Sequence, residues 1–517
     1  MSVIPHSEFL RRIQGGEALF IFDGRVYKVD KFMHQHPGGR LAIWHMIGRD
    51  ATSEIRVMHP DSVITHKMPR YCQGEYLPED MASETACESD EGVQGLNNSP
   101  LKPPVSTVGP GFIPPESNHA YNQCLPSHDS LPEVQDLTTR TVNRSVARAA
   151  REVEYETLPV DYEAVEKDFQ VLQAEILARG LHQTRYSCYG REAIRYFLFL
   201  AGMLGLSLYG PVHWLNYTLS AVCTGLLWQQ LALCVHDLGH NGVTHDLFWD
   251  GLIGVILADF VGGLSVGWWK KNHNVHHIVT NDAEHDPDIQ HLPFFAVTTK
   301  LFRNLRSSYY GRVLRFDAVA ALLIPVQHLL YIPILCFGRF NLYFLSVSHL
   351  LTADFAPWRW LELTGIACFW AWYGTFLTAF PTWQWALFHF VLSHMVTVIL
   401  HLQITLSHFG MSTTCPDPDR ECFAARQLRT TMDIDCPEWF DWFHGGLQYQ
   451  VEHHLFPRLP RHNLRAVQPL VKDFAARHPG LKFYSFGFTH ALELVLDSMK
   501  SVGEQVQDWL QTRAKLM

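Results

Sequence analysis

The sequence predicts a chain in three parts, which are an α+β domain at residues 1–77, a disordered linker at 78–158, and an all-α integral membrane domain at 159–517 with about four transmembrane helices. Two observations predict the first two parts. The early stretch IFDGRVYKVDKF has the pattern of two strands joined by a turn, and the region after it is rich in Pro, Ser, Asn, Glu and Thr. The third observation is a pair of long stretches without any Asp, Glu, Lys or Arg, each with room for two membrane spans.

The composition limits the class of protein. Hydrophobic residues make up 47% of the 517 residues and charged residues 18%. This hydrophobic content is high for a soluble enzyme and low for a transporter with many membrane spans. A net charge of −10 argues against a nucleic-acid binder, so no nucleic-acid partner is expected. The 11 cysteines contain no CxxC pair, which favours reduced thiols. The N-terminus lacks the long apolar segment of a secretory signal, so the first domain is expected in the cytosol.

The hairpin of the first domain and the linker after it are both predicted from short stretches of sequence. In IFDGRVYKVDKF, the pair Asp23-Gly24 lies between two apolar runs, which predicts a β-hairpin. The region from 77 to 158, for example NNSPLKPPVSTVGPGFIPPES, shows few apolar periods. Such a composition cannot bury a core, so a flexible linker is predicted there.

The membrane domain is expected to contain two helical hairpins. Residues 196–236 and 363–416 carry no charged residue, and their turns are predicted at 211–214 and 380–383. Trp and Pro at both turns are typical of the membrane interface, and neither turn holds a Lys or Arg. Basic residues lie on the other side, at Arg191, Arg195, Lys270, Lys271, Arg303, Arg306, Arg312 and Arg315. By the positive-inside rule the turns are lumenal and the rest of the chain is cytosolic.

Two further apolar regions are ambiguous. Residues 247–269 are interrupted by Asp250 and Asp259, and residues 318–353 contain two prolines and two histidines. Helices that lie in the membrane interface are expected in both regions. A single full span in either region would place the histidine clusters on opposite faces of the membrane.

Three histidine clusters lie next to predicted spans. In HDLGH, His236 and His240 are four residues apart, so one helix face can present both imidazoles to one metal. The second cluster, HNVHH, follows a Trp-Trp-Lys-Lys segment. The third, QVEHH, has Gln where the second has its first His. The candidate metal ligands are His236, His240, His273, His276, His277, His408, Gln450, His453 and His454, with His408 on a predicted helical face shared with His401.

The ligand types predict a site for two metals. Imidazole suits Fe, Zn, Cu and Ni, and no Cys lies in the clusters. Eight or more His exceed the needs of one ion, and two metals with open coordination sites can bind and activate O₂. An isolated His on an apolar helix, such as His389 or His394, is instead expected to be structural or interfacial. The carboxylates expected to orient the imidazoles are Asp237, Asp282, Glu284, Asp286 and Glu452.

The three clusters and their membrane placement resemble the membrane-bound fatty-acyl and sphingolipid desaturases. The resemblance implies that histidines of all three clusters hold two irons and that O₂ serves to remove two hydrogens from an unactivated methylene pair. In the front-end group of these enzymes the third cluster begins with Gln, as it does here at Gln450, and a cytochrome b5 domain is fused at the N-terminus. Gln450 offers an amide oxygen that binds iron more weakly than imidazole does.

The stretch VYKVDKFMHQHPGGRLAIWHMIGRDATSEIRVMHP resembles cytochrome b5. His36 lies in the His-Pro-Gly-Gly motif of that family, and His59, 23 residues later, matches its second ligand of haem b. Two axial ligands leave no open site, so this haem is expected to carry electrons. His34 and His45 lack the surrounding motif. The resemblance also implies an upstream NADH-cytochrome b5 reductase as the source of the electrons.

The substrate prediction rests on a narrower resemblance. The stretches NHNVHHIVTNDAEHDPDIQHLPFF and HLQITLSHFGMST are most similar to fungal sphingolipid Δ8-desaturases, although Leu238 stands where a small residue is usual. This implies a trans C8–C9 double bond in the sphingoid base of ceramide, made in the endoplasmic reticulum membrane with the haem domain and active site on the cytosolic side. The alternatives are a front-end Δ5 or Δ6 fatty acyl desaturase and a lipid hydroxylase on the same iron scaffold. A b5-type electron carrier with a simple anchor would need no histidine clusters.

Overall fold

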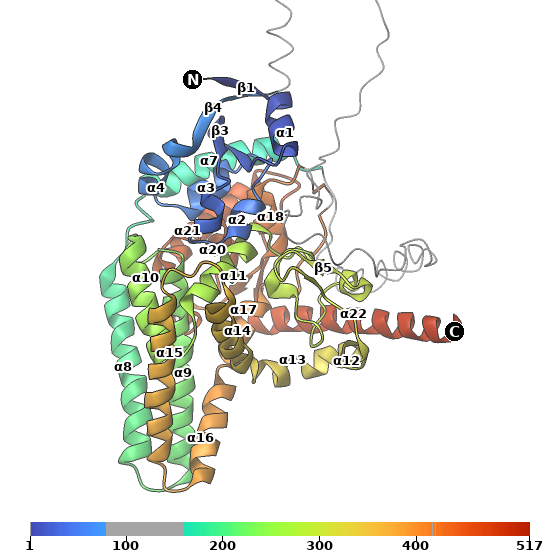
Figure 1. Cartoon of the computed structure of the whole chain (residues 1–517). Coiled ribbons are helices and arrows are strands. Elements are labelled where there is room, and N and C mark those ends of the chain that lie inside the picture. Colours follow the sequence, from blue (N-terminus) through green and yellow to red (C-terminus); the bar gives the residue numbers. More distant parts are fainter. Residues whose placement is uncertain (1, 79–158, 416, 419, 517) are drawn as a thin grey trace, which may run out of the picture.

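Figure 1 shows the computed structural model of the chain, which describes residues 2–78, 159–415, 417–418 and 420–516. A small domain with a sheet lies at one end, and a bundle of long helices extends away from it. The predicted order, an α+β domain followed by a helical membrane domain, is confirmed. The predicted linker, residues 78–158, lies outside the described residues apart from Pro78.

The N-terminal domain is built on a four-stranded sheet. Its strands are β1 (Val3–Pro5), β2 (Leu19–Phe22), β3 (Arg25–Lys28) and β4 (Cys72–Leu77), in the order β1-β4-β3-β2. β1 runs parallel to β4, and the other pairs are antiparallel. The helices around the sheet are α1 (His6–Gln14), η1 (Phe32–Gln35), α2 (Arg40–Trp44), α3 (Thr52–Met58), α4 (Asp61–His66) and η2 (Met68–Tyr71). His36 directly follows η1, and His59 directly follows α3.

The predicted hairpin is confirmed. β2 and β3 pair in register up to Phe22 opposite Arg25, so Asp23 and Gly24 form the turn. Their φ angles are 48° and 66°. Positive φ at both central positions is typical of the type I′ turn of two-residue hairpins, for which Asp-Gly is a favoured pair.

Four long helices form the membrane bundle. They are α8 (Tyr186–Leu208), α9 (Trp214–Gly239), α15 (Arg359–Thr378) and α16 (Trp383–Val396). Figure 1 shows them running side by side, with their two connecting turns at the end that lies away from the N-terminal domain. Both turns overlap the predicted positions. α17 (Val398–Leu406) follows α16 and leads back toward the histidines.

The number of candidate membrane spans is close to the predicted four, but they are not all the helices that were predicted to span the membrane. Length and composition mark Trp214–Gly239, Ala318–Leu335 and Trp383–Leu406 as able to cross a membrane, and a fourth if the bent pair Leu247–Val261 and Val266–Ile278 is one span. α8 is not among them because it carries Arg191, Glu192 and Arg195. α15 is not among them either, since its Trp and Tyr side chains make it less apolar.

The two ambiguous regions fold into short, bent helices. The first contains α10 (Leu247–Val255), the π-helical η5 (Ile256–Val261) and α11 (Val266–Ile278), with a bend of 115° before α11. The second contains α12 (Ala318–Leu323), η8 (Ile324–Val326), α13 (Gln327–Leu335) and α14 (Gly338–Thr352). Figure 1 shows α12 and α13 running across the direction of the bundle. This arrangement favours the interfacial position, which stays a prediction.

The remaining helices are α7 (Tyr162–Ala178), α18 (Phe423–Thr430), α19 (Asp441–His444), α20 (Gln450–Leu455), α21 (Leu464–Ala476) and α22 (Phe488–Leu516). α7, α18, α20 and α21 form a cap at the end of the bundle that faces the N-terminal domain, whereas α22 runs out sideways beside α12 and α13. Shorter pieces are η6 (Pro287–Ile289), η7 (Thr299–Arg303), β5 (Arg306–Ser307), β6 (Arg312–Val313), β7 (Asp433–Asp435), η9 (Glu438–Phe440), η10 (Arg461–Asn463) and β8 (Ser485–Gly487). α7, α18, α20 and α21 share one apolar core, which fixes α20 in place.

The N-terminal domain packs directly on the membrane domain. Val275, Ile278 and Val279, at and just after the end of α11, belong to the same apolar cluster as the core of the N-terminal domain. Conversely, Val57 of α3 in the N-terminal domain belongs to the apolar core that α7, α18, α20 and α21 share. Burial of apolar side chains from both domains in shared clusters stabilises one docked arrangement.

Candidate functional site

α9 and α11 present the first two histidine clusters to each other. His236 lies in the last turn of α9, and His240 directly follows this helix. Gly239 allows the close approach, because a Cβ at this position would lie 2.0 Å from the ring of Trp269 on α11. The ring of Trp269 in turn packs on His236 and His273, with centroids 5.4 and 4.4 Å apart. The small residue between the two histidines therefore has a packing role.

α20 presents the third cluster. This short helix holds Gln450, His453 and His454, and all three side chains are buried. Its start is fixed by Asp433, whose Oδ1 accepts a hydrogen bond from the Val451 amide at 3.0 Å. The apolar core shared with α7, α18 and α21 holds the other face of α20, so its histidines point toward α9 and α11.

The first histidine group consists of His236, His240, His273 and His453, whose candidate ligand nitrogens all lie within 4.8 Å of one another. The Nε2 atoms of His236 and His273 are 3.2 Å apart. His277 lies against this group, since its Nε2 is 3.1 Å from the Nε2 atoms of both His273 and His453. The first group therefore unites all three clusters of the sequence.

The second histidine group consists of His276, His408 and His454, whose candidate ligand nitrogens also lie within 4.8 Å of one another. All three side chains are buried. The ring of His454 stacks on that of His277, with centroids 4.2 Å apart, so the two groups are direct neighbours. One helix, α11, contributes to both.

Hydrogen bonds at Nδ1 orient the rings of the second group. The acceptors are Asp286 Oδ2 for His276 at 2.9 Å, the Thr430 carbonyl for His408 at 3.3 Å, and Gln427 Oε1 for His454 at 3.0 Å. Such bonds leave Nε2 of each ring free to face a metal. His276, Asp286 and Asp288 could also form a ligand set of their own. The hydrogen bond from Nδ1 favours Asp286 as an orienting group instead.

The donor set fits metal ions. The Nε2 atoms of His240 and His454 are buried and have no hydrogen-bond partner among the described residues. Burial and the neighbouring imidazoles hold the pKa of His453 and of His454 well below the usual range, so both rings are neutral, as metal ligands must be. Buried ring nitrogens without partners that converge on common points are the geometry expected of a metal site.

Gln450 is the first residue of α20. It precedes His453 by three residues and His454 by four, so its side chain leaves the helix on the side of both histidines. The second group has three imidazoles, whereas the first has four and His277 beside them. The role of Gln450 as a ligand or hydrogen-bonding group stays a prediction.

His36 and His59 face each other in the N-terminal domain, with ring centroids 5.9 Å apart. The Nδ1 of His36 donates to the Gly39 carbonyl and that of His59 to the Ile55 carbonyl, each at 3.1 Å, which leaves both Nε2 atoms free. Burial lowers the pKa of His36 and lowers that of His59 to about 4. Two neutral, oriented imidazoles fit the two axial positions of a haem.

Several residues lie differently from what the sequence predicted. His401 and His408 were expected on one helical face, but only His408 reaches the second group. His401 instead donates from Nδ1 to the Thr397 carbonyl at 2.9 Å. Asp282 caps its own turn through the amides of Glu284 and His285. The orienting residues that the sequence did not indicate are Asp288, Gln427 and Thr430. Of these three residues, only Asp288 could have been predicted from the sequence, because it lies two residues after the predicted orienting residue Asp286.

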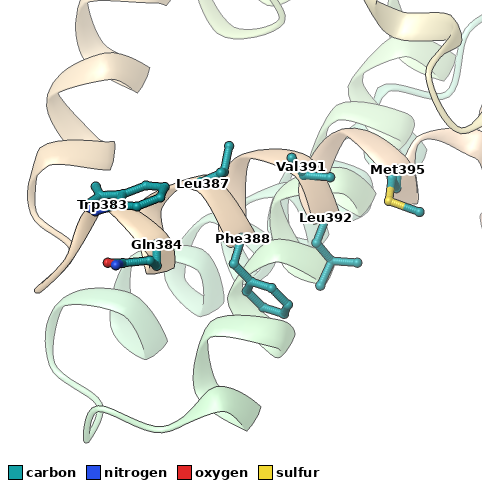
Figure 2. Close-up of a pocket in the computed structure, with 7 residues that line it drawn as sticks. All are labelled: Trp383, Gln384, Leu387, Phe388, Val391, Leu392 and Met395. Atoms are coloured by element: carbon teal, nitrogen blue, oxygen red, sulfur yellow. The ribbon is translucent and has the colours of Figure 1, made fainter.

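A shallow apolar groove along α16 lies outside the histidine groups. Figure 2 shows its lining, in which Trp383, Leu387, Phe388, Val391, Leu392 and Met395 follow one side of the helix with Gln384. The groove has a volume of about 420 Å³. His389 and His394 of the same helix are buried away from it, where Ser220 and Tyr343 contact their Nε2 atoms. The groove holds no metal-ligating side chain.

Comparison with known families decides the class of protein. Residues 212–486, more than half of the chain, match the family described as Fatty acid desaturase. The chain belongs to the fatty acid desaturase family. Residues 5–77 of this desaturase match the Cytochrome b5-like Heme/Steroid binding domain. It is therefore an integral membrane oxidoreductase with a family-implied di-iron site, a haem domain, a lipid substrate and a redox partner.

The desaturase has full-length relatives. A protein of Emericella nidulans named "Delta 8-(E)-sphingolipid desaturase" is 41% identical, over 96% of this chain and 93% of the relative. A protein of Komagataella phaffii with the same name is also 41% identical, over 98% and 94%. A "Delta(8)-fatty-acid desaturase" of Helianthus annuus is 35% identical over 67% of this chain and 76% of the relative.

Proposed function

We propose that this desaturase introduces a trans C8–C9 double bond into the sphingoid base of ceramide in an O₂-dependent reaction. Its electrons come through the haem of the fused N-terminal domain. The single observation that carries the reaction class is the pair of adjacent histidine groups, joined by α11 and buried at the inner end of the bundle. The names and lengths of the fungal relatives support the substrate.

The histidine groups supply the places for two irons. His236, His240, His273 and His453, with His277 beside them, would hold one iron, and His276, His408 and His454 would hold the other. Iron bound in this way would supply the activation of O₂. The protein's own contribution is to orient the rings of the second group through Nδ1 and to exclude water by burial.

The docked N-terminal domain supports direct electron delivery. Gly38 and Gly39, in the motif of His36, lie against α11, where a Cβ on Gly38 would come within 3.0 Å of Asn274 Nδ2. Asn274 directly follows His273 of the first group. One helix thus touches the haem-ligand loop and carries three of the histidines. An NADH-cytochrome b5 reductase is the proposed source of the electrons.

The proposed location is the endoplasmic reticulum membrane, with the haem domain and both histidine groups on the cytosolic side. The positions of the two bundle turns, away from the N-terminal domain and without Lys or Arg, support this orientation. The N-terminal domain and the histidine groups lie at the opposite end of the bundle from these turns. They would therefore face the same compartment as the reductase.

Expression in a yeast that lacks Δ8-unsaturated sphingoid bases tests the substrate. We expect long-chain bases 2 mass units lighter, with the double bond at C8, and no such product from the His273→Ala variant. Bases heavier by about 16 mass units would instead identify a hydroxylase. New double bonds confined to fatty acyl chains would overturn the sphingolipid assignment in favour of an acyl desaturase, for which the name of the Helianthus annuus relative is the supporting observation.

The His36→Ala variant tests the electron-donor role. Loss of one axial ligand should abolish turnover in the same yeast while the non-haem iron content stays unchanged. The matched control is His34→Ala, because His34 lies two residues away and is exposed. Full activity of His36→Ala without any added cytochrome b5 would show that the fused domain does not donate the electrons.

A further inference from the structure

Cationic side chains of the membrane domain lie at the loops that hold His36 and His59. Arg458 Nη1 donates to the His59 carbonyl at 2.7 Å. Lys271 packs against Gly39, where a Cβ would lie 3.3 Å from its Cγ. Lys270 directly precedes Lys271 on α11. Arg458 and Lys271 thus reach the haem-ligand loops from outside the N-terminal domain.

None of these cations has an acidic partner in the described part of the chain. Neither Lys270, Lys271 nor Arg458 forms an ion pair within 4.0 Å with a described residue, and Lys270 Nζ has only the Asn241 side-chain oxygen at 3.5 Å. Arg458 is 8% exposed, and its Nε is buried without a hydrogen-bond partner. Burial lowers the pKa of Arg458 to about 10, although Asp61 and Asp250 act in the opposite direction.

Positive charge that is taken out of water without a counter-charge is destabilising, so an anion is expected at this interface. A haem held by His36 and His59 carries two propionate carboxylates. Carboxylates match the ammonium group of Lys271 and the guanidinium of Arg458. The haem is the anionic group that the facing pair His36 and His59 itself implies.

We propose that Lys271 and Arg458 bind the propionates of the haem across the domain interface. The inference rests on haem ligation by His36 and His59, and it goes beyond the proposed reaction. These cations are positioning residues: they hold the haem edge against α11 and keep the two domains docked. Positive charge beside the haem also favours the reduced state, which has one positive charge fewer.

The test measures the haem of the purified full-length protein rather than its activity. Lys271→Met is the main variant, because Lys271 is half-buried and its loss should leave the fold intact. Lys167→Met is the matched control, since Lys167 is exposed on α7 and pairs only with Glu163. Each protein is reconstituted with haem b and, separately, with haem dimethyl ester, in which both propionates are neutral. The midpoint potential and the rate of haem loss to apomyoglobin are measured.

With haem b, we expect Lys271→Met to lower the reduced-to-oxidised ratio at a fixed potential by about threefold to tenfold. Haem loss should accelerate by a similar factor, and Lys167→Met should change neither. With haem dimethyl ester the effect of Lys271→Met on haem loss should disappear, whereas its direct Coulomb effect on the midpoint potential should remain. Arg458→Lys should retain most of the wild-type behaviour, whereas Arg458→Met should resemble Lys271→Met.

Equal acceleration of haem loss with haem b and with its dimethyl ester would overturn the proposal, because the lysine would then act on something other than the propionates. No change in either Lys271→Met or Arg458→Met would overturn it as well. A bis-histidine visible spectrum in every variant shows that the haem site itself is present. Failure of the proposed function would appear separately, as the absence of Δ8-unsaturated bases from yeast that express the wild-type protein.

Discussion

The two histidine groups differ in how many imidazoles they hold and in how firmly these are oriented. The first group has four imidazoles with His277 beside them, but its Nδ1 contacts with acids are long, at 3.7 Å for His236–Asp237 and 3.9 Å for His273–Asp288. The second group has three imidazoles, and each Nδ1 has an acceptor at 2.9 to 3.3 Å.

This difference suggests two ways of holding an iron. A group with surplus imidazoles tolerates some freedom in each ring, because the remaining ligands keep the metal in place. A group with few imidazoles depends on each of them, so its rings are fixed by hydrogen bonds. With fewer imidazoles, the second group is the more vulnerable of the two to the loss of a ligand.

Removal of one ligand from each group should have the largest effect. His273→Ala and His276→Ala should both reduce turnover by more than about 100-fold. Their metal contents should differ, because His276→Ala leaves two imidazoles in the second group and His273→Ala leaves three in the first with His277 beside them. Metal analysis of the purified variants should show one non-haem iron lost in His276→Ala and a smaller loss in His273→Ala. Equal losses would contradict the proposed difference between the groups.

Loss of an orienting carboxylate should have the next largest effect. Asp286→Asn weakens the acceptor for His276 Nδ1 and should lower activity by about 10- to 100-fold. The matched variant Asp237→Asn changes a carboxylate that lies 3.7 Å from His236, so its effect through the ring should be smaller. Activity and iron content of the two variants, measured in parallel, check this order. The reverse order would mean that orientation matters more in the first group.

Substitution of Gln450 should have a moderate effect. Gln450→Ala removes an amide on the side of α20 that carries His453 and His454 and should lower activity by about tenfold. Gln450→His adds an imidazole and should strengthen iron retention in the presence of a chelator. If the Ala variant retains full activity and full iron content, Gln450 is neither a ligand nor a hydrogen-bonding group of the site.

The pH dependence of stability that Glu54 causes at the domain interface should be the smallest effect. It should leave both histidine groups intact. Glu54 lies in an interdomain cavity of about 1110 Å³ with Arg49, Glu166 and Arg426, and burial raises its pKa to about 7. Because the folded pKa lies above the ordinary value of 4.5, the stability that protonated Glu54 contributes is fully present below about pH 4.5 and is lost as pH rises from there to 7. The melting temperature should therefore fall by several degrees between about pH 4.5 and pH 7, and Glu54→Gln should flatten this dependence. An unchanged slope in Glu54→Gln would assign the effect to other groups.

The sequence predicted the parts that depend on local composition. Charge-free stretches located the two helical hairpins, and Asp23-Gly24 located the turn between β2 and β3. The clusters found by spacing converge because α9, α11 and α20 end at one place in the fold. These features follow from hydrophobicity and turn chemistry, which act over a few residues.

The sequence could not predict the contacts that depend on the folded chain. His401 and His408 were expected on one helical face, but α17 ends at Leu406, so His408 lies in the following turn and is free to reach the second group. Gln427 and Thr430 orient His454 and His408 from α18, which no periodicity connects to the clusters. The docking of the N-terminal domain on α11 likewise depends on side chains far apart in the sequence.

The most direct test of the account is the ratio of non-haem iron to haem in the purified full-length wild-type protein, measured by metal analysis together with Mössbauer spectroscopy. Two adjacent histidine groups and one bis-histidine haem site predict two non-haem irons per haem, in two distinguishable environments because the groups differ in imidazole number. A ratio of one, or two irons in identical environments, would contradict the pairing of an imidazole-rich site with an imidazole-poor one.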